Sequence, residues 1–167
     1  MTLPSPSGGL LAGFDAGQTH TRCRLSQRDG RVIAEGEGSG VSHLGSEQGP
    51  ERFRQALQSS LEAARRQGGA ALAPLAAAAI GASGIEQDSP TQRLGTDLAR
   101  QALELDAVLV TGDERTALAG AFAPGQAGIS LISGTGAIAL GQNEQGRQHR
   151  CAGWGWRVDG VGIWRSP

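Results

Sequence analysis

The chain has 167 residues, enough for one domain with a sizeable core. Its formal net charge of -1 does not indicate a nucleic-acid-binding surface. All 15 basic residues are arginine, which excludes a Walker-type phosphate loop with its Gly-Lys pair, and also a Schiff-base lysine. No stretch is long and apolar enough to predict a membrane span. Because Cys23 and Cys151 lie far apart and show no metal-ligand spacing, we expect free thiols and a cytoplasmic protein.

Residues 1–9 are rich in Pro, Ser and Gly and lack the charged start and apolar core of a signal peptide, so we expect a disordered tail. An apolar run over residues 10–14 then ends in the tripeptide Asp-Ala-Gly at residues 15–17, and alternation resumes through Cys23–Leu25. This pattern predicts a buried strand, a tight polar turn and a second strand. The turn offers a carboxylate, hydroxyls and accessible backbone N–H groups, which is chemistry that suits a metal-bound phosphate.

The turn signal Asp29-Gly30 predicts a third strand over Arg31–Glu35, so the chain is expected to open with three antiparallel strands. The glycine-rich stretch Glu35–Gly45 is interpreted as a loop, either at the edge of a cleft or simply at the surface. Its glycines do not form a dinucleotide fingerprint, because the third glycine and the helix are not at the required offsets. Ser46–Gln67 is the strongest helix prediction, since its apolar residues recur at helical spacing and Gly68-Gly69 follows.

The remaining segments predict alternating strands and helices. Leu75–Ala82 is interpreted as a buried strand, and Ser89-Pro90-Thr91-Gln92 as a helix start with capping-box spacing. The apolar side of that helix is predicted to consist of Leu94, Leu98 and Leu103. The elements predicted after it are strand Ala107–Thr111, helix Glu114–Ala123, and strands Gly128–Ser133, Ala137–Leu140 and Arg147–Cys151. This order predicts a single α/β domain over residues 10–167, with a mixed sheet of about five to seven strands flanked by helices.

Asp113 directly follows a buried strand and opens a helix. Ligands of open α/β sheets bind at the carboxyl ends of the strands, where a carboxylate can take the proton from a sugar hydroxyl as that hydroxyl attacks a γ-phosphate. Asp is also a good helix N-cap, and the two roles can coexist.

Three segments, in this order along the chain, resemble the superfamily of sugar kinases, heat-shock ATPases and actin, and most of all its N-acetylglucosamine kinase and BadF-type ATPase branch. Residues 15–21, DAGQTHT, are similar to the first phosphate motif Asp-Gly-Gly-Gly-Thr-Lys-Thr and keep its acid, middle glycine and both threonines. Asp113 stands where the family has its general base. Residues 134–136 resemble the second motif Gly-Thr-Gly-Ser, with Ala137 in place of the serine.

The resemblance implies a ribonuclease-H-like, actin-like ATPase domain that uses ATP and Mg²⁺. It implies Asp113 as the general base and Asp15 as the residue that helps to hold Mg²⁺, directly or through water. The residues it implies for binding the nucleotide phosphates are Gly17, Thr19, Thr21, Gly134, Thr135 and Gly136.

Weaker matches imply contacts to an amino sugar such as N-acetylglucosamine. Ser42-His43 lies where the family often has Ser-Asn, and Ser83-Gly84 ends a strand near the expected cleft. Asp159 follows a Gly-Trp-Gly segment at residues 153–155, in a continuation that lacks the family's Asp-Glu pair. Each of these is also compatible with an ordinary polar loop.

The resemblance covers only the first half of a family enzyme, so we expect an amino-terminal lobe without its second lobe. Its partners would be a small sugar and either a second copy of the chain or a complementary second-lobe chain. One alternative is a BadF-type activator ATPase, whose iron–sulfur cluster is held by cysteines, but Cys23 and Cys151 are not spaced as a cluster pair. The other alternative is a truncated, non-catalytic lobe that binds a partner, a sugar or nothing.

Overall fold

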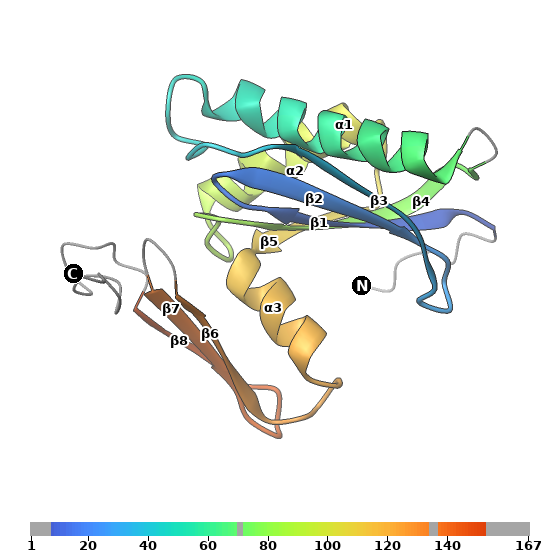
Figure 1. Ribbon diagram of the computed structural model, residues 1–167. Helices are drawn as coiled ribbons and strands as arrows, with labels where there is room; N and C mark the ends of the chain where they lie inside the picture. Colours follow the sequence, from blue (N-terminus) through green and yellow to red (C-terminus); the bar gives the residue numbers. More distant parts are fainter. Residues whose placement is uncertain (1–7, 70–71, 134–136, 153–167) are drawn as a thin grey trace, which may run out of the picture. The chain divides into compact units, whose positions relative to one another are not determined.

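The computed structural model describes residues 8–69, 72–133 and 137–152, shown in Figure 1. The chain divides into a first unit that ends at Asp113 and a second unit that begins at Glu114. The elements are β1 Leu10–Ala16, β2 His20–Ser26, β3 Val32–Ser39, α1 Gly49–Gly68, β4 Leu75–Ala82, α2 Pro90–Leu103, β5 Val108–Gly112, α3 Asp113–Ala121, β6 Gly128–Ser133, β7 Ala137–Gln142 and β8 Gln148–Ala152. In the described part of the chain, no helix is long and apolar enough to cross a membrane.

The first unit is a five-stranded mixed sheet in the order β3-β2-β1-β4-β5. The three opening strands pair antiparallel, as predicted, whereas β1, β4 and β5 run parallel to one another. In Figure 1, α1 and α2 lie together over one face of this sheet. The predicted α/β class and mixed sheet are therefore confirmed.

Alternation along β1 explains why one face of the sheet is apolar. Leu10, Ala12 and Phe14 are buried, whereas Gly13 and Asp15 between them are exposed. The helix α1 presents Phe53, Leu57 and Leu61 to the core; fully burying such a side chain stabilises the fold by about 1.5–3 kcal/mol. The core of the first unit therefore lies between the sheet and its two helices.

The interpretation of Glu35–Gly45 as a loop is wrong for its first half, because β3 continues to Ser39. A Cβ atom on Gly36 would lie 2.1 Å from the backbone nitrogen of Ala64, and one on Gly38 would lie 2.3 Å from Oγ of Ser59. These glycines therefore allow α1 to approach β3 closely, which a local reading of the sequence does not reveal.

The start of α2 has the predicted N-cap, but one of the three leucines predicted to form its buried apolar side is exposed. Oγ of Ser89 accepts a hydrogen bond from the Gln92 N–H at 3.0 Å, while Leu94 is 41% exposed. Gly95 is buried instead, and a Cβ there would lie 3.3 Å from side-chain carbons of Ile85, Leu44 and Val110. The small residue lets α2 sit close to the core.

The second unit contains an antiparallel three-stranded sheet in the order β6-β7-β8. The three strands predicted for this part of the chain are present, and Leu118 of α3 and Leu140 of β7 are buried. Phe122 lies directly against Gly128, where a Cβ would be 2.3 Å from its ring. These strands thus form their own sheet, and the grouping of residues 10–167 into a single domain stays a prediction.

Candidate functional site

The carboxyl ends of three parallel strands meet at one edge of the five-stranded sheet. The pairing register aligns Ala16, Ala82 and Gly112 across β1, β4 and β5. Asp15 lies one residue before this row, and Asp113 one residue after it. The structure therefore brings both predicted carboxylates to the same edge, the usual ligand-binding edge of such sheets.

The turn between β1 and β2 is fixed by backbone hydrogen bonds. The Gly17 N–H donates to the carbonyl of His20 at 3.1 Å, and the Gly17 carbonyl accepts from the Val41 N–H at 2.9 Å. The Ser83 N–H donates to the Ala16 carbonyl at 3.1 Å, which ties the end of β4 to the end of β1. Asp15 and Thr19 remain exposed at this fixed turn.

Thr21 does not reach the turn surface, so its position does not support the predicted phosphate contact. Its side chain is 0% exposed, on the same face of β2 as the buried Cys23 and Leu25. Oγ1 of Thr21 has no hydrogen-bond partner within the described residues. The polar residues of the turn that remain accessible are Asp15, Gln18 and Thr19.

The two loops predicted to touch the sugar lie against each other. A Cβ on Gly84 would be 3.5 Å from Cδ2 of His43, and Gly84 has a φ of +79°, which favours glycine. Nδ1 of His43 accepts a hydrogen bond from the Gly45 N–H at 3.4 Å, and Ser46 donates to the His43 carbonyl through Oγ at 2.7 Å. Because Nδ1 accepts this bond, Nε2 is the ring nitrogen that is left for a ligand, and it lies 3.7 Å from the position of a Cβ on Gly84.

Ser42 and Ser83 are both half-buried at the same edge. Asp113 is half-buried as well and is the first residue of α3, while the neighbouring Glu114 is only 4% exposed. Thr111, which sequence reasoning did not select, shares a register row with Gly81 and Asp15, and its Oγ1 is buried without a hydrogen-bond partner in the described part of the chain. The sequence feature that could have identified Thr111 is its place as a threonine at the end of an otherwise apolar strand.

The second phosphate motif and one sugar residue lie outside the described residues: Gly134, Thr135, Gly136 and Asp159. The strands that flank the motif are described. β6 ends at Ser133 and β7 begins at Ala137, and these two residues pair. The strands that the sequence predicted before and after the motif are thus confirmed.

The described residues contain no group of three or more His, Cys, Asp or Glu side chains that could enclose a metal ion. One exposed carboxylate, Asp15, at a turn with accessible backbone groups nevertheless fits Mg²⁺. This ion is usually held by one or two carboxylates, with waters and substrate phosphates completing its shell.

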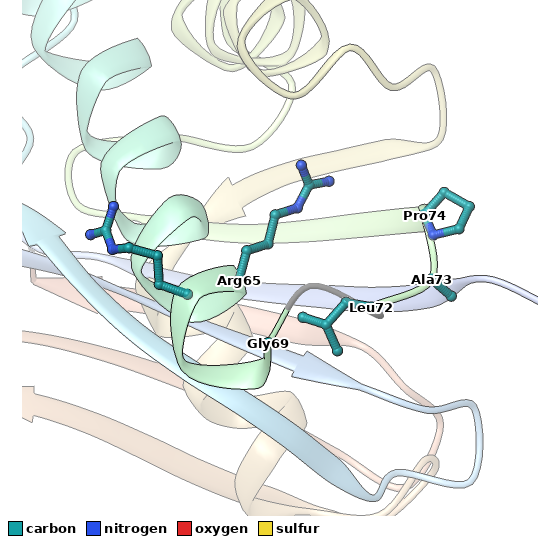
Figure 2. Close-up of a pocket in the computed structure, with 6 residues that line it drawn as sticks. Arg65, Gly69, Leu72, Ala73 and Pro74 are labelled. Carbon is teal, nitrogen blue, oxygen red and sulfur yellow. The ribbon is translucent and has the colours of Figure 1, made fainter.

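A pocket of about 640 Å³ lies elsewhere, at the end of α1 and the segment that enters β4 (Figure 2). Its lining includes Arg65, Leu72 and Pro74. Pro74 precedes β4, whereas the candidate site follows it, so the pocket is at the opposite end of that strand. None of the predicted site residues that the structure describes lines it.

The two cysteines have different environments. Burial raises the pKa of the Cys23 thiol from 9.0 to about 12, against a smaller opposing effect of the Arg65 charge. Cys151 is exposed, and it belongs to β8 in the second unit, whereas Cys23 belongs to β2 in the first. A buried protonated thiol is a poor metal ligand.

Comparison with known proteins identifies similar sequences and similar structures. The family model of the BadF/BadG/BcrA/BcrD ATPase family matches residues 12–163. The chain is 31% identical over 145 residues to the N-acetylmuramic acid/N-acetylglucosamine kinase of Clostridium acetobutylicum, covering 87% of this chain and 46% of that protein. A structure from Chromobacterium violaceum, provisionally named an N-acetylglucosamine kinase, is 35% identical with a TM-score of 0.73, covering 90% of this chain and 51% of that one.

A ROK-family glucokinase from Streptomyces griseus, solved with glucose and AMPPNP, shares the fold at 21% identity and a TM-score of 0.58, with 86% of this chain and 49% of that one covered. The fold is therefore that of the actin-like ATPases and sugar kinases. The chain spans about half the length of the relatives it matches.

Proposed function

The chain belongs to the BadF/BadG/BcrA/BcrD ATPase family, and from this membership we propose that it contributes the catalytic edge of an ATP-dependent kinase acting on an amino sugar such as N-acetylglucosamine. The observation that carries the proposal is the pairing register that brings Asp15 and Asp113 to one edge of the sheet. The relatives named for N-acetylglucosamine support the choice of acceptor.

In this proposal Asp113 is the general base. The carboxylate accepts the proton of the sugar hydroxyl as the hydroxyl oxygen bonds to the transferred phosphorus. Bound ATP supplies the phosphoryl group, and Mg²⁺ offsets its negative charge. Asp15 holds the metal ion directly or through water, while the Gly17 backbone and the Thr19 hydroxyl contact phosphate oxygens, a role we also assign to Gly134, Thr135 and Gly136.

The sugar would lie over the two loops that contact each other near the end of β4. Nε2 of His43 can donate to a sugar oxygen, and the hydroxyls of Ser42 and Ser83 can donate or accept. Gly84 leaves room beside the imidazole, and Asp159 is a further proposed sugar contact. The single-domain grouping and a homodimeric or complementary-lobe partner are also proposals.

A second candidate, an ATPase activator with an iron–sulfur cluster, is disfavoured by the buried, protonated Cys23. An iron-containing, brown preparation would reverse this preference.

The test is phosphoryl transfer from radiolabelled ATP to N-acetylglucosamine with the Asp113→Asn variant. We expect turnover to fall at least about 100-fold, because the proton acceptor is lost, while Mg²⁺-dependent ATP binding is retained. Asp97→Asn is the matched control, since its side chain is 69% exposed on α2 and pairs only at the surface with Arg100. Unchanged turnover in Asp113→Asn would contradict the assigned base.

A further inference from the structure

Two threonine hydroxyls of the five-stranded sheet are buried without a hydrogen-bond partner among the described residues, Oγ1 of Thr21 and Oγ1 of Thr111. Thr21 is 0% exposed and Thr111 is 7% exposed. Most buried hydroxyls are paired, because a buried donor that loses water without gaining a protein partner destabilises the fold. Each of these two hydroxyls therefore needs a physical explanation.

The two hydroxyls lie on opposite faces of the sheet. Thr21 alternates onto the face of the buried Cys23, which α1 and α2 cover in Figure 1. On β5, Val110 lies on that covered face, since its Cγ1 is 3.3 Å from the position of a Cβ on Gly95 of α2. Thr111 is the next residue of the strand, so its side chain points to the other face.

Thr111 shares both its face and its row with Asp15, and both residues belong to the first unit. The register pairs Asp15 with Gly81 and Gly81 with Thr111, and Asp15 follows the buried Phe14, so it also points away from the two helices. Neighbouring strands lie about 4.8 Å apart, which places the Cα atoms of Asp15 and Thr111 about 10 Å from each other. Gly81 between them contributes no side chain, so the row holds a carboxylate and a hydroxyl on either side of bare backbone.

The chemistry of this row fits an oxygen atom of a metal–phosphate complex. Mg²⁺ that is held by one or two carboxylates keeps several waters about 2.1 Å away, and these waters donate hydrogen bonds, whereas phosphate oxygens accept them. A threonine hydroxyl can pair with either, because it carries one proton and two lone pairs. Bulk water does not reach Oγ1 of Thr111, so the oxygen must arrive with the ligand while the atoms that enclose Oγ1 move aside.

We propose that Thr111 is a further binding residue of the nucleotide site, whose hydroxyl hydrogen-bonds an oxygen of the metal–phosphate complex that Asp15 holds. That oxygen belongs either to a metal-bound water or to a phosphate group. The proposal rests on the proposed function, because it takes Asp15 as the residue beside the metal ion. None of the three segments that resemble the kinase and ATPase superfamily includes Thr111. Because the hydroxyl gains its partner only on binding, it stabilises the loaded site relative to the empty one.

Thr111→Val keeps the shape of the side chain and removes its hydroxyl. In calorimetric titration of the full chain with ATP and Mg²⁺, we expect the affinity to fall about 5- to 20-fold, because one hydrogen bond to the ligand is lost. Thr111→Ser keeps the hydroxyl and should bind within about twofold of the wild-type affinity. Equal affinity of Thr111→Val and wild type, or an equal loss in Thr111→Ser, would overturn the proposal.

Thr96→Val is the matched control. It also removes a threonine hydroxyl, but Oγ1 of Thr96 donates to the Gln92 carbonyl at 2.8 Å within α2 and lies away from the row of Asp15. Its affinity for ATP and Mg²⁺ should stay within about twofold of wild type. A loss as large as that of Thr111→Val would mean that any lost threonine hydroxyl weakens binding, and would overturn the specific contact.

Titration with ATP in the presence of EDTA distinguishes the two sources of the oxygen. A loss of affinity in Thr111→Val that occurs only with Mg²⁺ would assign the partner to a metal-bound water. A loss that persists without the metal ion would assign it to a phosphate oxygen. Both results support the contact and differ only in its partner.

Thermal unfolding without ligand separates a binding role from a structural one. Thr111→Val should keep the wild-type melting temperature or raise it by up to about 4 °C, because an unpartnered hydroxyl does not support the fold. A fall of more than about 2 °C would mean that Oγ1 has a structural partner, and would overturn the proposal.

These outcomes are distinguishable from a failure of the proposed function. Binding of ATP and Mg²⁺ by the wild type with no loss in Thr111→Val would overturn this inference alone. A loss in Thr111→Val without phosphorylation of N-acetylglucosamine by the wild type would keep the contact and contradict the kinase. No binding by the wild type would overturn both.

Discussion

The two sheets of this protein differ in the side chains that they expose on one face. On the five-stranded sheet, the face away from α1 and α2 carries cross-strand ion pairs, Arg24–Glu35 at 2.7 Å and Arg22–Glu37 at 3.3 Å. On the three-stranded sheet, one face carries exposed Ile129 and Leu131, and the described strand residues of that face include no permanent charge. Charged cross-strand pairs suit a face that meets water, whereas exposed apolar side chains suit a face that meets protein.

The difference separates a unit with a closed core from one that still has apolar surface to bury. In the first unit, Phe53, Leu57 and Ile80 are at most 1% exposed between sheet and helices. In the second, Leu118 and Leu140 are the described apolar residues that are buried. Substitutions and pH can test this contrast between the two units.

The strongest test compares one large apolar side chain from each region. Phe53→Ala empties a space in the closed core and should lower the free energy of unfolding by about 3–5 kcal/mol. Leu131→Ala, at a side chain that is 64% exposed, should change it by less than about 0.5 kcal/mol. Urea denaturation of both variants checks this, and equal losses would mean that Leu131 is already buried in solution.

A second test compares two strand glycines of the first unit. Gly36→Ala places a methyl group against the Ala64 backbone and should cost about 1–3 kcal/mol, because α1 must shift. Gly13→Ala meets nothing within 4 Å and should be neutral or slightly stabilising. Thermal unfolding of the two variants measures both effects. An unchanged stability of Gly36→Ala would contradict the close approach of α1 to β3.

A third test uses pH. Because burial raises the pKa of Cys23 from 9.0 to about 12, its contribution to stability is complete below pH 9 and is lost as pH rises toward 12. The sequence contains no lysine or tyrosine whose titration would mask this loss. We therefore expect the free energy of unfolding to fall across this alkaline range, and the fall to be absent in Cys23→Ala. The same slope in both proteins would assign the effect to another group.

The smallest expected effect is at the charged face. Arg24→Gln removes a pair whose side chains are 68% and 52% exposed, so the loss should be about 0.2–1 kcal/mol and should shrink in high salt. Chemical denaturation at low and high salt measures it. A larger, salt-independent loss would mean that this face is covered by protein.

Local patterns predicted most of the fold. Alternation and turn residues located the opening hairpin, and the cap at Ser89 located the start of α2. The same alternation places Thr21 beside Cys23 and Leu25 on the buried face, so its burial was open to prediction, but the motif match drew attention to its hydroxyl instead. A resemblance in sequence does not say which way a strand residue points.

Features that depend on distant contacts could not be predicted. Gly36 and Gly38 were interpreted as loop residues because the helix that needs them begins more than ten residues later. The contact between His43 and Gly84, and the register that aligns Ala16 with Gly112, follow from sheet pairing rather than from spacing. The sequence predicted a site at the edge of the sheet, whereas only the structure shows which residues lie next to one another there.

Calorimetric titration of the intact chain with ATP in the presence of Mg²⁺ tests directly whether the carboxyl edge of the five-stranded sheet binds a nucleotide. We expect saturable binding of one nucleotide with a dissociation constant at or below about 1 mM, weakened about tenfold or more by Asp15→Asn and unchanged by Asp97→Asn. Absence of any binding heat at millimolar ATP, or equal binding by Asp15→Asn, would contradict a phosphate site at the carboxyl edge of the five-stranded sheet.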